Sequence, residues 1–212
     1  MKLATLTNKP KKELASIHDF GAKLRQPYLL PRLKEYVAWQ AGLRQASGEQ
    51  VPDFVPVSIN LDLTTACNYA CPHCIDSRII NTQARFDQAA LLASLEALSK
   101  KGLKSVILLG GGEPTLYPKF EEVVEFLKQY KISLAVSTNG SKMNRIANVA
   151  HLLGKPDWIR VSLDSGTNPT FQAMHKPKIP ITLEQICKQA REIKKGFQIL
   201  RWDIPILLSW EI

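Results

Sequence analysis

Short apolar runs alternate with amphipathic stretches along most of the chain, and this alternation restricts the fold more than any other feature. Runs rich in β-branched and other apolar residues predict strands over Val57–Leu63, Ser105–Leu109, Ile132–Ser137 and Ile159–Leu163. Strands and helices that alternate in this way are typical of an α/β fold with a parallel sheet, either open or curled into a barrel. Ligands of such folds bind beyond the carboxyl ends of the strands, so we expect the functional residues there.

Capping residues and apolar stripes mark the helices between these strands. We expect helices from Asp87 to Gly102, over Phe120–Leu127, from Ser141 to Gly154, and after the capping-box pair Thr182 and Gln185. The apolar stripe of the last helix is Leu183, Ile186, Cys187, Ala190 and Ile193. A β-like run over residues 197–212 follows, and we expect a fifth strand there.

The first 55 residues differ from this pattern. Apolar residues recur at helical spacing from Pro10 to Leu24 and from Pro31 to Arg44, and each proline suits a first helical turn. The stretch from Ala46 to Pro56 is polar and rich in turn-forming residues. We therefore predict a helical extension with a linker over residues 1–55 and an α/β domain over residues 56–212.

The composition of the chain indicates its cellular location and the kinds of partner that it binds. The chain has 212 residues, of which 45% are hydrophobic, and no run approaches the roughly 20 apolar residues that a membrane span needs. Its N-terminus lacks the apolar segment of a secretory signal, so we expect a cytoplasmic protein without membrane contact. The net charge of +9 is spread out, with no basic block beyond Lys9, Lys11 and Lys12. Nucleic-acid binding therefore stays open but unsupported.

Cysteines cluster directly after the first predicted strand. Cys67, Cys71 and Cys74 form the pattern CxxxCxxC, and no fourth cysteine is nearby. Zinc sites and ferredoxin clusters are usually closed by four ligands, whereas three thiolates around four irons leave one iron open to a substrate or cofactor. A zinc site that adds His73 to the triplet is the alternative. The remaining cysteine, Cys187, belongs to the apolar stripe of the last helix, so we expect a buried, inert thiol.

Small and polar residues follow the other predicted strands. Gly110–Glu113 follow the second strand and Asn139 follows the third. The glycines allow the backbone to approach a ligand, and a carboxylate at Glu113 can accept from an ammonium group. Ser162 and Asp164 share one face of the fourth strand, and in a barrel we expect them to be buried inside with polar partners.

Together these segments resemble the radical S-adenosylmethionine (radical SAM) enzymes, most of all the subgroup of cofactor-maturation and peptide-modifying enzymes. The motifs are CNYACPHC at 67–74, GGEP at 111–114, STNG at 137–140 and VSLDS at 161–165. The resemblance implies a (β/α) barrel, a 4Fe-4S cluster and SAM. It also implies that reductive cleavage of SAM yields a 5'-deoxyadenosyl radical, which abstracts hydrogen from a peptide or small-molecule substrate. The electron would come from a donor such as flavodoxin or ferredoxin.

The resemblance also implies residue roles. Cys67, Cys71 and Cys74 would each hold one iron. The SAM contacts would come from Gly111, Gly112 and Glu113 at the methionyl amino group, Asn139 beside SAM, Ser162 and Asp164 at the ribose or the methionyl carboxylate, and His73 near the adenine. His175 is expected in the loop after the fourth strand as a supporting residue. No catalytic side chain is assigned.

The sequence departs from the family in its number of strand-helix units. A radical SAM core has about six, whereas this chain supplies about four and a fifth strand, so we expect an incomplete barrel that lacks the last unit. An apolar run from Ile204 to Ile212 would then form an open edge, and the isolated chain would bind SAM weakly and aggregate. Two other hypotheses stay open, namely a truncated, noncatalytic remnant and a zinc-binding or nucleic-acid-binding module.

Overall fold

The computed structural model describes residues 29–45, 55–84, 87–197 and 201–202. The chain divides into two units, residues 1–57 and residues 58–212. The predicted helix over Pro10–Leu24, most of the predicted linker and the apolar run after residue 202 lie outside the described residues. The division into a helical extension with a linker over residues 1–55 and an α/β domain over residues 56–212 stays a prediction.

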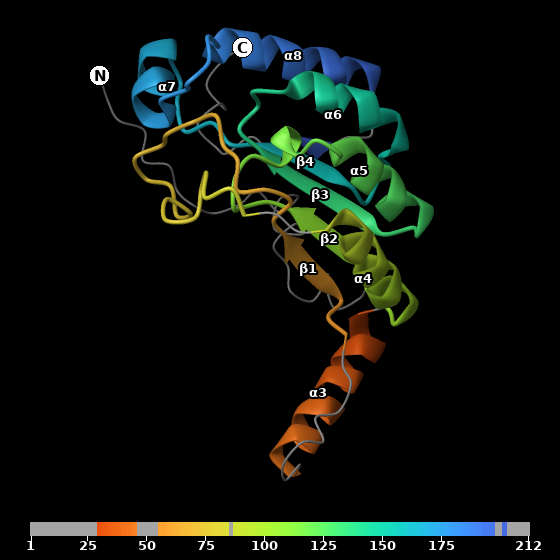
Figure 1. The fold of residues 1–212 in the computed structure, drawn as a ribbon. Helices are drawn as coiled ribbons and strands as arrows, with labels where there is room; N and C mark the ends of the chain where they lie inside the picture. The colour runs from red at the N-terminus through yellow and green to blue at the C-terminus, as the bar shows by residue number, and fades with distance from the viewer. Residues whose placement is uncertain (1–28, 46–54, 85–86, 198–200, 203–212) are drawn as a thin grey trace, which may run out of the picture. The chain divides into compact units, whose positions relative to one another are not determined.

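In the first unit the structure describes one helix, α3 (Leu29–Gln45), drawn in orange in Figure 1. It confirms the helix predicted over Pro31–Arg44. The Gln40 side chain donates to the Tyr36 hydroxyl at 2.6 Å, one turn away along the helix. Contacts at this spacing stabilise a helix by a few tenths of a kcal/mol each.

The second unit is built on a parallel sheet whose spatial order follows the chain. Its described strands are β1 (Ser58–Leu61), β2 (Ser105–Leu108), β3 (Ser133–Thr138), β4 (Trp158–Val161) and β5 (Arg201–Trp202). They lie in the order β1-β2-β3-β4-β5, and all of their pairings are parallel. Parallel neighbours need a crossover between them, which the intervening helices supply. The predicted α/β class is confirmed.

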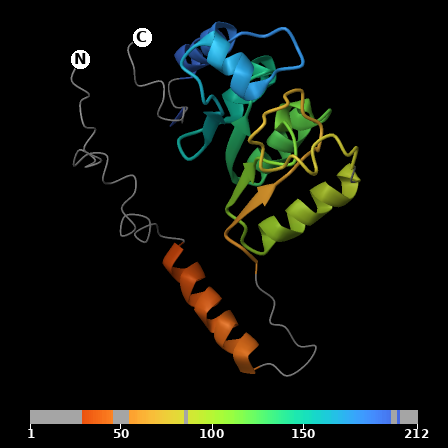
Figure 2. The ribbon, with the colours of Figure 1, turned by 90° about the vertical axis from the view of Figure 1, so that its left-hand side faces the viewer.

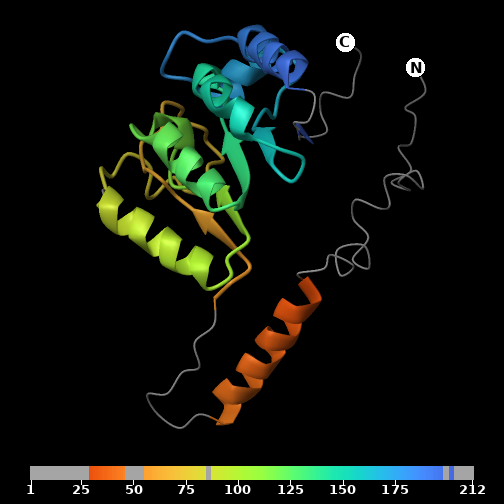
Figure 3. The same ribbon diagram turned by 90° about the vertical axis from the view of Figure 1, so that its right-hand side faces the viewer.

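Helices cover one face of this sheet, and Figure 3 looks onto them. They are α4 (Gln88–Lys100), α5 (Phe120–Gln129), α6 (Met143–Val149) and α8 (Leu183–Gly196), and η2 (Ala150–Leu152) is a one-turn 3-10 helix that follows α6. The short helices η1 (Pro114–Leu116) and α7 (Asn168–His175) follow β2 and β4, and α7 lies at the opposite side, beside the loop after β1 (Figures 1 and 2). Apolar side chains fill the core between the sheet and the helices, and Val106, Leu134 and Val123 are among those that are fully buried there. Burial of each such side chain contributes roughly 1.5–3 kcal/mol.

The capping residues read from the sequence act as predicted. The Asp87 side chain accepts from the backbone N–H of Ala89 at 2.8 Å. Thr182 and Gln185 form the reciprocal capping box at the start of α8. Gly102 has a φ of 112° just beyond α4, a conformation that favours glycine at a helix end.

Three local predictions are wrong. β4 ends at Val161, so Ser162 and Asp164 lie just beyond the strand, and both are partly exposed rather than buried. His175 is the last residue of α7 rather than part of a loop. Cys187 is partly exposed, because the buried stripe of α8 runs through Leu183, Ile186, Ala190 and Ile193 and leaves Cys187 at its margin.

Within the described ranges, no helix combines the length and apolarity that crossing a lipid bilayer requires.

Candidate functional site

The loop with the three cysteines lies beyond the carboxyl end of β1, and Figures 1 and 2 show it in gold. Hydrogen bonds between backbone groups tie it to the end of α7. The Ala70 N–H donates to the carbonyl of His175 at 3.2 Å, and the Lys178 N–H donates to the carbonyl of Asn68 at 2.9 Å. Between these two bonds, Tyr69 forms an antiparallel bridge with Pro177. The loop is thus paired with a segment about 100 residues away, as the pairing of 69 with 177 shows.

The Tyr69 side chain anchors the same loop in the core. Its ring is 1% exposed and packs edge-on against Phe171 of α7, with 5.9 Å between ring centroids. The Cys67 N–H, two residues earlier, donates to the Asn81 side chain at 2.9 Å. The backbone that carries Cys67, Cys71 and Cys74 is therefore fixed from both sides. The three thiols form no disulfide and are partly exposed.

The glycines after β2 pack against the cysteine loop. A Cβ atom on Gly112 would lie 2.3 Å from the carbonyl oxygen of Ala66, so only glycine fits there. The next residue extends this contact, because the Glu113 N–H donates to the same carbonyl at 2.8 Å. In this structure the backbone that Gly112 approaches is that of the chain itself, just before Cys67.

The Glu113 carboxylate is 3% exposed and accepts four hydrogen bonds. Oε1 accepts from the N–H and hydroxyl of Thr115 at 3.1 and 2.6 Å and from the Thr138 hydroxyl at 2.6 Å. Oε2 accepts from the N–H of Asn139 at 2.6 Å. Burial raises the pKa of Glu113, and the hydrogen bonds from Asn139, Thr115 and Thr138 oppose that rise. Glu113 joins the end of β2 to the end of β3.

Asn139 extends this network to the cysteine loop. Its side-chain N–H donates to Oδ1 of Asn68 at 2.9 Å, and the Ser141 hydroxyl donates to the same oxygen at 3.2 Å. Asn68 directly follows Cys67. The predicted residues Glu113 and Asn139 are thus brought together with the loop through their mutual hydrogen bonds.

The end of β4 reaches the loop through two histidines. His73 Nε2 lies 3.4 Å from Oδ2 of Asp164. The Asp164 N–H donates to Nε2 of His175 at 3.1 Å, and Nδ1 of His175 lies 3.5 Å from Sγ of Cys71. Ser162 contacts the end of β3, with its hydroxyl oxygen 3.4 Å from that of Ser137. The structure therefore places every predicted site residue at the carboxyl ends of β1 to β4.

The pKa values of Cys67 and Cys71 are both raised. Burial raises the pKa of Cys71 to about 11, and the charges of Cys67 and Cys74 add to the rise. Burial also raises the pKa of Cys67, where Glu113 and Cys74 add to it and hydrogen bonds from Tyr69 and Asn139 oppose it. Thiolates in this loop need a positive partner, which a bound metal would supply.

The donor set fits an iron-sulfur cluster by its chemistry. Within the described part of the chain, no three His, Cys, Asp or Glu side chains converge so as to hold one metal ion. A cubane of four irons does not require that convergence, because each thiolate binds a different iron. Soft thiolates are the ligands that such clusters select.

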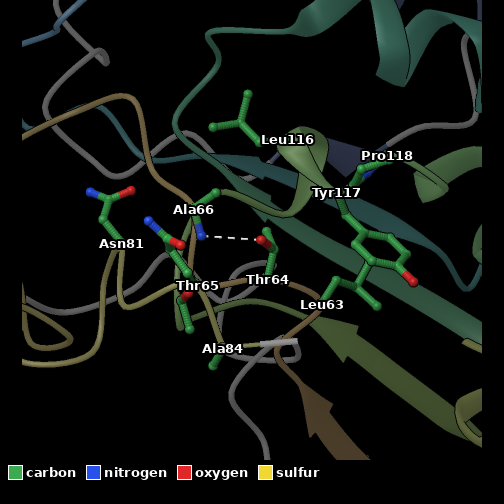
Figure 4. Close-up of a pocket in the computed structure, with 10 residues that line it drawn as sticks. Leu63, Thr64, Thr65, Ala66, Asn81, Ala84, Leu116, Tyr117 and Pro118 are labelled. Atoms are coloured by element: carbon green, nitrogen blue, oxygen red, sulfur yellow. Dashed lines mark hydrogen bonds between the residues drawn. The ribbon is translucent and has the colours of Figure 1, made fainter. Parts of the chain in front are cut away.

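A cavity of about 570 Å³ adjoins the segment before Cys67 (Figure 4). Its lining includes Leu63–Ala66 from the end of β1 and Leu116–Pro118 from η1 and the turn after it. The Ala66 N–H donates to the Thr64 hydroxyl at its rim, at 3.1 Å. None of the three clustered cysteines, Glu113 or Asp164 lines it, so this cavity is distinct from the predicted SAM contacts.

Comparison with known protein families shows to which family the chain belongs. A model of the "Radical SAM superfamily" matches residues 61–207. The chain belongs to the radical SAM superfamily. This confirms the family resemblance drawn from the cysteine and glycine motifs, and it places the chain among enzymes.

Curated radical SAM relatives match about half of this chain or more. An S-adenosylmethionine-dependent nucleotide dehydratase of Thermoplasmatales archaeon (strain ISO4-H5) is 33% identical over 51% of this chain and 38% of its own length. The mycofactocin maturase MftC of Mycobacterium ulcerans is 31% identical over 53% of this chain and 30% of its own. A probable GTP 3',8-cyclase of Pyrococcus horikoshii is 29% identical over 71% and 47%. The match thus spans less than half the length of each relative.

Solved structures of proteins with bound S-adenosylmethionine share the fold. Streptococcus suis SuiB bound to S-adenosylmethionine superposes with a TM-score of 0.59 at 18% identity, over 81% of this chain and 38% of SuiB. The anSMEcpe structure with bound AdoMet gives a TM-score of 0.55 at 17% identity, over 69% of this chain and 43% of anSMEcpe. The described sheet is therefore part of a radical SAM barrel, as predicted.

Sequence reasoning missed several residues that support the site. Asn68, Thr138 and Tyr69 each hold the cysteine loop or Glu113, yet none was singled out. A signal existed for Thr138, which stands beside Asn139 at the end of a predicted strand. No local signal pairs Asn68 with Asn139, because their contact depends on the order of the strands.

Proposed function

We propose that this chain binds a 4Fe-4S cluster through Cys67, Cys71 and Cys74, binds SAM at the fourth iron, and cleaves it reductively to abstract hydrogen from a peptide or small molecule. The position of the cysteine loop is the observation that carries this proposal. The loop lies at the carboxyl end of β1 and is braced by residues from the ends of β2, β3 and β4. That edge is where α/β folds bind ligands.

When bound, the cluster and SAM supply the electron transfer and the radical chemistry, and the chain positions them. Cys67, Cys71 and Cys74 hold three irons as thiolates. Asp164 and Ser162 are partly exposed at the end of β4, where they can accept from or donate to ribose hydroxyls. His73, with its side chain 45% exposed, presents a flat ring at the same edge, which suits the adenine.

The hydrogen bonds of Glu113 within the chain give it a structural role besides the expected contact with the methionyl amino group. Oε1 accepts from three donors of the chain and Oε2 from one. Each carboxylate oxygen has about two acceptor sites, so Oε2 keeps one site for a further donor. We therefore assign Glu113 first to holding η1 and Asn139 in place. The methionyl ammonium would donate to the remaining site of Oε2 without breaking any of these hydrogen bonds.

The substrate class rests on the relatives. SuiB has been solved bound to the precursor peptide SuiA, and MftC is a maturase, which supports a peptide. The nucleotide dehydratase and the GTP cyclase support a small molecule. A low-potential donor such as flavodoxin or ferredoxin would supply the electron, and a cytoplasmic location would keep the thiols reduced.

Anaerobic reconstitution tests the proposal. We expect about four irons and four sulfides per chain, and 5'-deoxyadenosine after reduction in the presence of SAM. Cys71→Ala should lose both, whereas Cys187→Ala should keep both, since Cys187 lies on α8 away from the loop. One zinc without sulfide would contradict the proposal and favour the zinc module. A complete cluster without nucleoside would contradict SAM cleavage and favour a noncatalytic remnant.

A further inference from the structure

His175 lies where the cysteine loop meets the end of β4. Its side chain is buried, with the residue 3% exposed, and it packs against Phe171 with 5.2 Å between ring centroids. Both ring nitrogens nevertheless face a polar partner. Nδ1 is 3.5 Å from Sγ of Cys71, and Nε2 is 3.1 Å from the backbone nitrogen of Asp164. A ring that packs against Phe171 and is held at both nitrogens has a fixed orientation.

The partner of Nε2 fixes the place of the ring proton. A backbone N–H such as that of Asp164 can only donate, so Nε2 accepts and carries no proton. In a neutral imidazole the proton is then on Nδ1, the nitrogen that faces Cys71.

The Cys71 sulfur lies near two groups of His175, the ring nitrogen Nδ1 as a donor and the backbone carbonyl as an acceptor. Its Sγ is 3.5 Å from Nδ1 of His175 and also 3.5 Å from the carbonyl oxygen of His175. A protonated thiol can donate to that carbonyl. Once Cys71 loses its proton to bind iron, only the Nδ1–H remains as a hydrogen-bond donor between the two. Hydrogen bonds to ionised acceptors are the stronger ones.

We propose that His175 is a positioning residue for the cluster, whose Nδ1–H donates to the Cys71 thiolate, fixes that ligand against α7 and raises the reduction potential. This inference rests on the proposed function, because Cys71 must be a cluster ligand. Donors to cluster sulfurs stabilise the reduced state, which carries more negative charge, more than the oxidised state. A cluster that has lost this donor should therefore be harder to reduce.

Three variants of His175 distinguish the effect of its hydrogen bond to Cys71 from the effect of its ring packing. His175→Asn places an amide N–H near the position of Nδ1 and keeps a donor toward Cys71. His175→Gln places its amide near Nε2 and keeps only the contact with the Asp164 N–H. His175→Phe keeps the ring volume and neither hydrogen bond. If packing alone mattered, phenylalanine would be the mildest of the three changes, whereas the proposal predicts that asparagine is.

Two measurements on the full chain decide the matter. The first is NMR of the cluster-free protein labelled with 15N-histidine, in which the ring-nitrogen shifts report the tautomer, and the His175→Asn spectrum identifies the signals of His175. We expect a protonated Nδ1 and an unprotonated Nε2. The second is the midpoint potential of the reconstituted cluster, followed by its electron paramagnetic resonance (EPR) signal.

For His175→Gln and His175→Phe we expect the reduction equilibrium to shift about three- to tenfold toward the oxidised form, where tenfold is about 59 mV for a one-electron couple. His175→Asn should stay within about twofold of the unmutated protein. An Nε2-protonated ring would overturn the proposal, and so would equal potentials in all variants. If the chain binds no cluster, the proposed function is refuted. The effect of His175 on the reduction potential is then refuted as well, even if the ring carries its proton on Nδ1 as expected.

Discussion

The Glu113 carboxylate is buried among four donors, and this arrangement makes it sensitive to a change of one atom. Glu113→Gln replaces one carboxylate oxygen by an NH₂ group, which cannot accept from Asn139 or Thr115. We expect the free energy of unfolding to fall by about 1–3 kcal/mol, because a buried donor then lacks its acceptor. Urea unfolding followed by circular dichroism measures it.

Glu125→Gln is the matched control for this change, because Glu125 is an exposed residue of α5. We expect its free energy of unfolding to stay within about 0.5 kcal/mol of the unmutated protein. Equal effects of the two substitutions would show that the hydrogen bonds of Glu113 do not hold the ends of β2 and β3 together.

Cys71 should react slowly with alkylating reagents in the cluster-free protein. Burial and the two neighbouring thiols raise its pKa to about 11, and only the thiolate is nucleophilic. At pH 8 we expect alkylation by iodoacetamide to be roughly one to two orders of magnitude slower than that of free cysteine, and to rise about tenfold per pH unit. Peptide mass mapping over time measures the rate. A rate equal to that of free cysteine would refute the raised pKa.

Individual site residues were predictable where they stand next to the end of a predicted strand. Glu113, Asn139 and Asp164 all do, and the fold brings them to one edge. Their hydrogen-bond partners were not predictable in the same way, since Asn68 meets Asn139 only because the loop after β1 crosses toward the end of β3. The hydrogen bonding of Glu113 also depends on Thr138, which belongs to a different strand.

At the scale of elements, the turn after β2 and the cysteine loop depend on each other for their shape. Gly112→Ala would place a methyl group 2.3 Å from the Ala66 carbonyl oxygen, so either the turn or the loop must move. We expect a loss of about 1–3 kcal/mol of unfolding free energy and a lower iron content after reconstitution. Chemical unfolding and iron analysis measure these effects.

Gly166→Ala controls for the loss of a glycine, because a Cβ there meets nothing within 4 Å. Gly166 follows β4 in the same edge of the sheet, yet this variant should keep both its stability and its iron. If the two variants behaved alike, the close approach of Gly112 to Ala66 would not matter for the loop.

Helix α7 shows why one element escaped prediction. It has only eight residues, Asn168–His175, of which Phe171 and His175 are buried. So short a stretch offers too few apolar positions for a helical period to be seen. Thr167, which caps α7, and Pro169 in its first turn were the local signals. The longer helices α4, α5 and α8 carry clear stripes, and all were predicted.

At the scale of the whole molecule, the strand-helix alternation was enough to predict a parallel α/β sheet. The pairing register, such as Ser58 with Ser105 and Ser105 with Ser133, was not predictable, because it follows from the packing of helices on the sheet. A fifth strand was predicted within residues 197–212, and β5 (Arg201–Trp202) is the part of it that lies in the described residues.

The central claim is that three cysteines leave one iron open and that SAM binds it. EPR of the reduced cluster, recorded with and without SAM, tests this most directly. SAM should change the signal of the unmutated protein, because a new ligand at one iron alters the electronic structure of the whole cluster. The Cys187→Ala variant should show the same change. A reduced cluster whose signal is identical with and without SAM would contradict the claim.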